Sequence, residues 1–339
     1  MPKKIGVIGA GSWGTALAKI LAEKGENVTI WCLEPEVAKG INEGHRNPLY
    51  ISDIELPPAI RATNDLDEAI SGREIILSAV PSRFVRNIWD KAGKYVGGST
   101  ILVSATKGIE LGTRKLMSEV LSDCLPGHPE SNRTFLSGPS FAPEVALGLP
   151  ASVVVAGKDP AVTRKVQDTF RTGTFLIFTN EDVVGVEVGG AVKNVIAIAA
   201  GMSDGLKFGH NARAAIITRG LYEMVKIGKA LGANPLTFIG LSGIGDLVLT
   251  CTADLSRNHT VGKKLGEGLS LEAILSQMKM VAEGIPTAEA VHHLAIKHGI
   301  NAPICEAMFR MLHKDLKPKE AVAWLCSLPL KDELRSILK

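Results

Sequence analysis

Hydrophobic residues in the first half of the chain come in short runs that alternate with amphipathic segments. The runs that we expect to form strands cover residues 4–8, 27–32, 74–80, 100–105, 151–157 and 175–179. Apolar residues recur at helical spacing over residues 12–25, 35–44 and 81–95. Short buried strands that alternate with helices are typical of an α/β, doubly wound fold with a parallel sheet.

The pattern changes after about Glu181. Long segments with helical periodicity follow, and the clearest cover residues 212–231, 287–297 and 303–314. We therefore expect an α/β domain over residues 1–181 and a mostly α-helical domain over residues 182–339. Residues 45–58 are rich in proline and polar side chains, so we expect a long loop there.

Composition excludes several classes of protein. The chain has 339 residues, 45% of them apolar, and a formal net charge of +3 without a basic block interleaved with aromatics, which argues against nucleic-acid binding. Its five cysteines are widely spaced and none forms a CxxC pair, as in the reduced thiols of a cytoplasmic protein. The first apolar run breaks at glycines, unlike a signal peptide. No apolar stretch approaches the roughly 18 residues that span a bilayer, so we expect no membrane insertion.

A glycine motif lies between the first expected strand and the first expected helix. Gly9, Gly11 and Gly14 fit the pattern GxGxxG. In this context Gly9 permits a tight turn, Gly11 lets the backbone approach a pyrophosphate, and Gly14 lets the helix pack on the sheet. The helix N-terminus then faces the negative charge. The alternative is a glycine-rich turn that holds no ligand.

The acidic residue after the second expected strand bears on the choice of dinucleotide. Glu34 lies where a carboxylate binds the adenosine ribose and favours NAD. It equally suits the start of the next helix beside Pro35. No arginine follows the strand immediately to hold a 2′-phosphate, and Lys39 and Arg46 lie nearby. The residues leave NAD and NADP open.

Lys193 stands out within the apolar stretch GGAVKNVIAIAAGM, residues 189–202. No acidic residue lies three or four positions away to pair with it on a helix. The lysine either extends its ammonium group from a buried helix to water, or it lines a cleft where desolvation lowers its pKa and suits it to proton transfer. The pattern alone leaves both interpretations open.

Glycine and polar residues are unusually dense in three later segments, residues 201–221, 240–252 and 256–268. Such segments cost stability in a helical domain, which indicates a site. Together with GGAVKN they resemble the NAD(P)-dependent glycerol-3-phosphate dehydrogenases, most closely the bacterial type of phospholipid synthesis. Further matching motifs are GAGSWGTALA from Gly9, VPS from Val80, ATKGIE from Ala105, LSGPSFAPEVALGLP from Leu136 and VAEG from Val281. The resemblance covers nearly the whole chain.

The resemblance implies a Rossmann-like domain, a helical substrate domain and the reversible reduction of dihydroxyacetone phosphate to sn-glycerol 3-phosphate with NAD or NADP. It implies that Lys193 is the acid/base, and that Asp246 and Lys107 assist it. The residues that match the family's substrate motifs are Lys107, Gly138, Ser140, Lys193, Asp246, Ser256, Arg257 and Asn258. Those that match its cofactor contacts, besides the glycines, are Ser12, Trp13, Leu33, Lys107, Ala142, Arg257, Val281 and Glu283.

The chain departs from the family pattern at two places. The cofactor position after the second strand is Leu33, which offers only backbone or apolar contact. Residues 51–53 read ISD where the family commonly has a Leu-Pro-Gly type of sequence, which puts the conformation of this segment in doubt.

These roles are physically sound without the resemblance. Hydride transfer to a ketone builds negative charge on oxygen, and a cation that can release a proton is the group required there. Asp246 could hold or polarise Lys193. Arg257 and Asn258 offer a fork of donors for a phosphate, although Ser-Arg-Asn is also an ordinary helix start capped by Ser256.

Other chemistries find little support. His292, His293 and His298 face different ways on one expected helix, so we expect no metal site. GPSFA at residues 138–142 is not the GxSxG of a hydrolase, and there is no Walker A motif. The rival functions are a β-hydroxyacid dehydrogenase and a non-catalytic nucleotide sensor. The sensor would not need Lys193 with Asp246. The apolar helices are compatible with a homodimer.

Overall fold

The computed structural model describes residues 1–278 and 282–329. The chain divides into two compact units, each described here by itself. The first unit comprises residues 1–106 and 117–183, and the second comprises residues 107–116 and 184–339. The segment Lys107–Leu116 thus belongs to the second unit, although the expected boundary near Glu181 placed it in the first.

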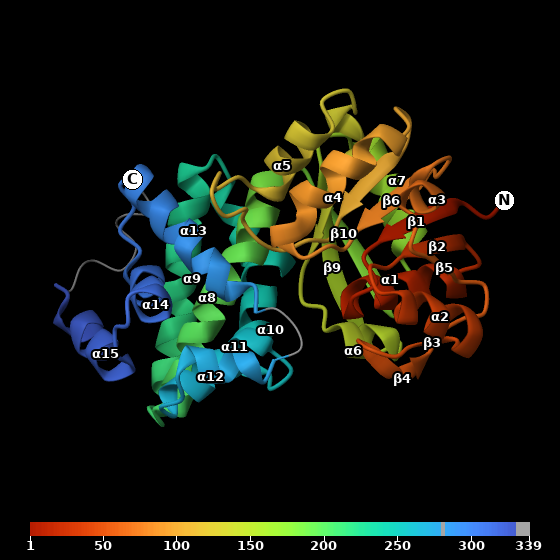
Figure 1. Cartoon of the computed structure of the whole chain (residues 1–339). Helices are drawn as coiled ribbons and strands as arrows, with labels where there is room; N and C mark the ends of the chain where they lie inside the picture. Colours follow the sequence, from red (N-terminus) through yellow and green to blue (C-terminus); the bar gives the residue numbers. More distant parts are fainter. Residues whose placement is uncertain (279–281, 330–339) are drawn as a thin grey trace. The chain divides into compact units, whose positions relative to one another are not determined.

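The first unit is an α/β structure (Figure 1). Its strands are β1 (Lys4–Ile8), β2 (Asn27–Trp31), β3 (Arg46–Asn47), β4 (Ile51–Glu55), β5 (Arg61–Thr63), β6 (Ile75–Ser78), β7 (Ile101–Ser104), β8 (Arg133–Ser137), β9 (Ala151–Gly157) and β10 (Phe175–Asn180). Its helices are α1 (Ser12–Glu23), α2 (Pro35–Gly44), α3 (Leu66–Ile70), α4 (Val85–Ala92), α5 (Met117–Cys124), α6 (Ala142–Ala146) and α7 (Pro160–Phe170).

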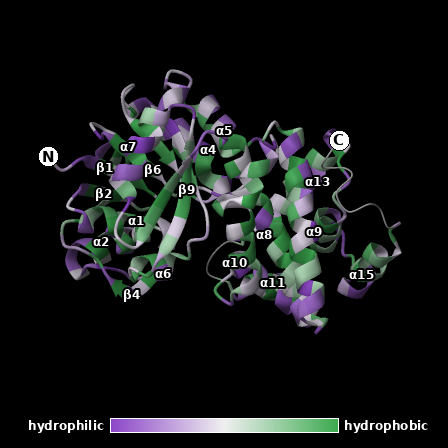
Figure 2. Cartoon of the chain, turned by 180° about the vertical axis from the view of Figure 1, so that it is seen from behind, coloured by the Kyte–Doolittle hydropathy of each residue, from purple (hydrophilic) through white to green (hydrophobic). Residues whose placement is uncertain are grey.

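The main sheet has the strand order β10-β9-β8-β7-β6-β1-β2-β5. Its two faces bury separate hydrophobic clusters, because successive side chains of a strand point to opposite faces. In β6, for example, Ile75 and Leu77 pack with α1 and α2, while Ile76 packs with α3, α4 and α5. Figure 2 shows β9 mostly in the colour of hydrophobic residues, as expected for a strand covered on both faces. The predicted doubly wound α/β fold is confirmed.

The sheet is not entirely parallel, which corrects the expected pattern. β8 and β9 pair antiparallel, and β10 runs parallel to β9. The connection between β8 and β9 contains only the five-residue helix α6. Such a helix rises about 7 Å, whereas the seven residues of β9 span about 23 Å. The helix of this connection is therefore too short to carry the chain back along the sheet, as the helix of a parallel crossover does.

The expected long loop at residues 45–58 is also wrong. Two strands form there, β3 and β4, and they pair antiparallel in a small sheet of their own. Ile51 and Ile54 are buried, and Asn47 is fully buried. The polar and proline-rich composition concealed this hairpin because its anchor is a polar side chain, Asn47, rather than an alternating apolar pattern.

The second unit is helical. Its helices are α8 (Val183–Gly205), α9 (Gly209–Ala230), α10 (Asp246–Thr252), α11 (Arg257–Gly266), α12 (Leu271–Ser276), α13 (Gly284–Lys297), α14 (Pro303–His313) and α15 (Pro318–Ser327). The helices expected at residues 212–231, 287–297 and 303–314 correspond to α9, α13 and α14. A π-helical turn, Leu241–Gly245, leads directly into α10.

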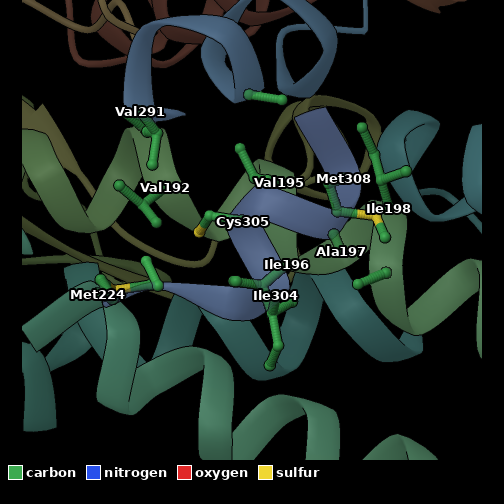
Figure 3. Close-up of a cluster of buried hydrophobic side chains, with 14 of the residues drawn as sticks. Val192, Val195, Ile196, Ala197, Ile198, Met224, Val291, Ile304, Cys305 and Met308 are labelled. Atoms are coloured by element: carbon green, nitrogen blue, oxygen red, sulfur yellow. The ribbon is translucent and has the colours of Figure 1, made fainter. Parts of the chain in front are cut away.

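Helix α8 forms the core of this unit. Figure 3 shows Val192, Val195 and Ile196 of α8 among side chains of the neighbouring helices, including Met224 and Cys305. α8 is also the one helix among the described residues that is long and apolar enough to cross a membrane, contrary to the expectation that no such stretch exists. However, 89% of its apolar window is buried inside the protein, and a core helix passes the same test.

Glycines let α8 and α11 touch through their backbones. A Cβ atom on Gly201 would overlap the carbonyl of His259, and one on Gly205 would overlap that of Lys263. From the other side, a Cβ on Gly262 would overlap the carbonyl of Ile198. The glycine density that indicated a site in residues 201–221 and 256–268 therefore serves, in part, this close helix crossing.

Candidate active site

The glycine motif of the first unit has the geometry of a dinucleotide loop. Gly9 has a φ of 110°, a conformation that L side chains rarely adopt, and a Cβ there would lie 2.8 Å from the carbonyl oxygen of Ala79. A Cβ on Gly14 would overlap the carbonyl of Gly9. At Gly11, by contrast, a Cβ would meet no described protein atom within 4 Å. Gly9 and Gly14 are thus required by the protein itself, whereas Gly11 faces space that a ligand could fill.

Helix α1 presents its N-terminus at this loop. Gly11 is its N-cap, and no described side chain caps the helix or places an acid in its first turn. The first backbone N–H groups of a helix lack partners within the helix, and together with the macrodipole they favour an anion. The loop and helix therefore fit the pyrophosphate of NAD or NADP.

The β3–β4 hairpin secures the glycine loop. The buried Asn47 Nδ2 donates to the carbonyl oxygen of Ala10 at 2.7 Å and to Thr15 Oγ1 at 2.9 Å. Ser12 Oγ donates to the carbonyl oxygen of Tyr50 at 3.1 Å. Asn47 was missed by the sequence analysis, because nothing in its sequence neighbourhood reveals a partner at Ala10.

Residues expected near the cofactor differ in their surroundings. Leu33 is 73% exposed. The carboxylate of Glu34 accepts a hydrogen bond of 2.8 Å from the Tyr50 hydroxyl, and it makes no capping bond to α2. Trp13 packs edge-on against Phe175, and its buried Nε1 has no partner among the described residues. Ala142 begins α6.

Two expected substrate residues, Gly138 and Ser140, lie after β8 in the first unit. Gly138 has a φ of 133°, and a Cβ there would lie 2.9 Å from the Cα of Val153. Ser140 Oγ donates to the carbonyl oxygen of Gly138 at 3.0 Å. Glycine is thus required at the turn whatever binds there.

The second unit contains a cluster of buried charges around Asp246. Lys193 Nζ lies 2.6 Å from Asp246 Oδ1 and 2.8 Å from Thr250 Oγ1. Lys107 Nζ lies 2.8 Å from the other carboxylate oxygen, Oδ2. The side chains of Lys193 and Asp246 are 8% and 1% exposed. The ammonium group of Lys193 therefore does not extend to water, and its partner, Asp246, lies 53 residues further along the chain.

These contacts shift the proton affinities of the cluster. Burial lowers the pKa of Lys193 to about 8, since desolvation and the nearby Lys107 outweigh the raising effect of Asp246. For Asp246, burial alone would raise the pKa, but Lys107 and Lys193 outweigh it and the pKa is lowered. The carboxylate is therefore ionised at neutral pH, and Lys193 is poised to gain or lose a proton near that pH.

Thr250 is a further member of this cluster that the sequence analysis missed. Its hydroxyl donates to the backbone carbonyl of Asp246 at 2.6 Å, so that a lone pair remains for the Lys193 ammonium group. The available signal was its position four residues after Asp246, on the same face of a helix.

The Ser256-Arg257-Asn258 segment begins α11. Ser256 Oγ caps the helix by accepting from the backbone N–H of His259, as the ordinary helix-start interpretation requires. Asn258 Nδ2 donates to Asn194 Oδ1 at 2.8 Å, and Asn258 Oδ1 accepts from the backbone N–H of Gly284 at 3.0 Å. Arg257 is exposed and Asn258 buried. The expected cofactor residue Glu283 precedes α13, and Val281 lies outside the described residues.

Comparison with known proteins agrees with this geometry. A model of the NAD-dependent glycerol-3-phosphate dehydrogenase N-terminus matches residues 4–163, and one of the corresponding C-terminus matches residues 182–323. The chain belongs to the NAD-dependent glycerol-3-phosphate dehydrogenase family.

Members of the glycerol-3-phosphate dehydrogenase family resemble this chain over nearly its whole length. The glycerol-3-phosphate dehydrogenase [NAD(P)+] of Geobacter sulfurreducens is 51% identical over 98% of this chain and 99% of its own. The crystal structure of glycerol-3-phosphate dehydrogenase from Coxiella burnetii has a TM-score of 0.92 at 38% identity, covering 96% of this chain and 99% of that one. The Saccharomyces cerevisiae enzyme has a TM-score of 0.82 at 28% identity, over 95% and 99% of the two chains.

Proposed function

We propose that this chain catalyses the reversible, NAD(P)-dependent interconversion of dihydroxyacetone phosphate and sn-glycerol 3-phosphate. The observation that carries the proposal is the ammonium group of Lys193, which is buried and shares the Asp246 carboxylate with Lys107. Family membership supports the substrate, since the similar proteins are named for glycerol 3-phosphate.

In this proposal Lys193 supplies the proton. In the reducing direction a hydride reaches the carbonyl carbon while a proton passes from Lys193 Nζ to the carbonyl oxygen, which yields the secondary alcohol. The neutral amine then regains a proton from solvent, and in the oxidising direction it accepts the hydroxyl proton. A lysine whose pKa is about 8 suits both directions near neutral pH.

Asp246 and Thr250 hold the amine in one orientation, because each offers an oxygen to Lys193 Nζ. Lys107 adds a second positive charge on the same carboxylate. That charge opposes protonation of Lys193 and stabilises the negative charge that develops on the substrate oxygen. Lys107 therefore acts on the reaction electrostatically, as a partner of Asp246.

The phosphate of the substrate is assigned to the start of α11. Arg257 offers a guanidinium fork, and the N-terminal turn of the helix favours an anion. The buried amide of Asn258 donates a hydrogen bond to Asn194, the residue directly after Lys193. The proposed phosphate contacts are therefore linked by one hydrogen bond to the residue next to the amine. Ser256, Gly138 and Ser140 complete the proposed substrate contacts.

The nicotinamide cofactor is assigned to the first unit, where Gly9, Gly11, Ser12, Trp13 and Gly14 would hold its pyrophosphate. When bound, the dinucleotide donates or accepts the hydride. The further cofactor contacts that we propose are Leu33, Lys107, Ala142, Arg257, Val281 and Glu283. We also propose that the protein works in the cytoplasm as a homodimer and supplies glycerol 3-phosphate for phospholipid synthesis.

Oxidation of NADH and NADPH by the purified protein tests the proposal. We expect absorbance at the nicotinamide band to fall when dihydroxyacetone phosphate is added, with either cofactor. Non-phosphorylated dihydroxyacetone is the matched control, and we expect it to be used at least about a hundredfold less well, because a charge-assisted fork is lost. Absence of any oxidation with the phosphorylated ketone would overturn the assignment.

A further inference from the structure

His259 is a buried ring that the proposed reaction does not use. It lies in the first turn of α11, directly after Arg257 and Asn258, and its side chain is 4% exposed. Its backbone N–H donates to Ser256 Oγ, and its Nε2 lies 2.8 Å from Asp204 Oδ2 near the end of α8. The buried ring nitrogen is thus satisfied by a carboxylate from another helix.

The partner of His259, Asp204, is also held by an arginine of a third helix. Asp204 Oδ2 also accepts from Arg213 Nη1 of α9 at 2.9 Å, and Arg213 Nη2 lies 2.8 Å from His210 Nδ1. Although partial burial raises the pKa of Asp204, its bonds to His259 and Arg213 lower it overall. The carboxylate is thus a fixed negative group that joins α8, α9 and α11.

The backbone of His259 is fixed at the same point. Its carbonyl packs on the Cα of Gly201 with no room for a Cβ atom. Ten residues before Asp204 on α8, Asn194 Oδ1 accepts a hydrogen bond from Asn258 Nδ2. The first turn of α11 is therefore held on α8 at two levels about 15 Å apart, by Asn258 and by the His259–Asp204 pair.

We propose that the His259–Asp204 pair is a positioning device for the phosphate contacts of Arg257 and Asn258. The pair fixes the rotation of the first turn about the axis of α11, and so the direction in which the neighbouring side chains project. Without it, the Ser256 cap and the Asn258 contacts would remain, but the turn would be held on α8 by side chains at one level instead of two. This inference rests on the proposed function, since it presumes that α11 receives a phosphate.

A merely structural role makes a different forecast. If the pair served only to stabilise the unit, its loss would lower the melting temperature and affect phosphorylated and non-phosphorylated ketones alike. A positioning role instead changes the KM for dihydroxyacetone phosphate and leaves kcat and the use of dihydroxyacetone nearly unaltered. The comparison of the two ketones therefore separates the two roles.

The experiment compares His259→Leu, which removes the ring nitrogen, with His259→Gln, whose amide can still donate to Asp204. With saturating NADH we expect His259→Leu to raise the KM for dihydroxyacetone phosphate about tenfold or more, with kcat within about threefold of the parent. Arg257→Ala should change the same parameter in the same sense. His259→Gln should restore the KM to within about threefold.

A partly buried histidine of the same unit, also paired with a carboxylate, provides the control. His292 of α13 pairs with Glu306 of α14 and stacks on Phe309, without contact to the start of α11 among the described residues. His292→Leu removes a comparable pair from the same unit, and we expect the KM for the phosphorylated ketone to stay within about twofold. If His259→Leu does not fold, Asp204→Ser at the partly exposed helix end takes its place, with the same expected pattern.

Inorganic phosphate gives a readout that needs no activity. It should raise the melting temperature of the parent and of His292→Leu, and raise that of His259→Leu or Asp204→Ser much less. An inactive parent that still shows this difference would refute the proposed reaction and support the positioning role. A KM within twofold of the parent in folded His259→Leu, equal losses with both ketones, or equal stabilisation by phosphate would overturn the positioning role.

Discussion

The two units build their candidate sites by opposite means. In the first unit the candidate site is built from glycines. At Gly9 and Gly14 other protein atoms occupy the space that a Cβ would need, whereas at Gly11 that space holds no described protein atom and is open to a ligand. In the second unit the candidate site is built from charged side chains, and burying any one of these charges without a partner would be costly. Lys193 and Asp246 stay buried because each has an opposite charge beside it, and the partly buried Lys107 shares the same carboxylate. The first candidate site is thus defined by the shape of the backbone, and the second by the pairing of charges.

The largest expected effect comes from removing the central charge. In Lys193→Met the proton donor is lost, and we expect kcat to fall by roughly 10²–10⁴-fold. Cofactor affinity should be unchanged, because the first unit supplies the glycine loop. Steady-state rates and titration of NADH fluorescence measure the two quantities. Lys263→Met, at an exposed position on α11, is the control. A rate within a few-fold of the parent would contradict the role of Lys193.

The charge balance also predicts opposite pH dependences for the two directions. Below about 8, the pKa of Lys193, the amine is protonated and can donate; above it, the amine is neutral and can accept. Ketone reduction should therefore fall about tenfold per pH unit above 8, and alcohol oxidation should rise up to that pH and then level. Profiles of kcat/KM in both directions check this. Profiles of the same sign would speak against a single proton carrier.

Two alanine substitutions test the shape of the first site. Gly11→Ala should fold normally, because Gly11 has an ordinary φ of −65° and open space beside it, yet its methyl group should raise the KM for the cofactor about tenfold. Gly14→Ala should instead destabilise the protein by roughly 1–3 kcal/mol, since its Cβ overlaps the Gly9 carbonyl. Melting temperatures and cofactor titrations distinguish the two. Equal effects of both variants would contradict the distinction.

The smallest expected effect concerns the choice of cofactor. We expect the parent to use NADH and NADPH with a preference below about a hundredfold. The Glu34 carboxylate is engaged by the Tyr50 hydroxyl, so Glu34→Ala should move the ratio of kcat/KM toward NADPH by less than about tenfold. Titration of both cofactors against parent and variant measures the ratio. An unaltered ratio would mean that the carboxylate does not meet the ribose.

The glycine loop of the first unit could be predicted from sequence because its determinants are local. A strand, three glycines and a helix lie within twenty consecutive residues, and local sterics dictate what each glycine does. The Asn47 anchor and the antiparallel β8–β9 pair escaped prediction, since both depend on partners far along the chain. In the second unit the residues alone left Lys193 ambiguous. Only the family resemblance joined it to Asp246 and Lys107, and nothing in the pattern revealed Thr250.

Two ammonium groups that share one carboxylate make the charge of the cluster depend on its occupant. With Lys193 protonated the three side chains carry one positive charge in excess, and with Lys193 neutral they carry none. An anionic ligand favours the protonated form, so binding of the ligand and uptake of a proton each strengthen the other. The ligand that takes up a proton during its reduction therefore also raises the fraction of Lys193 that carries one.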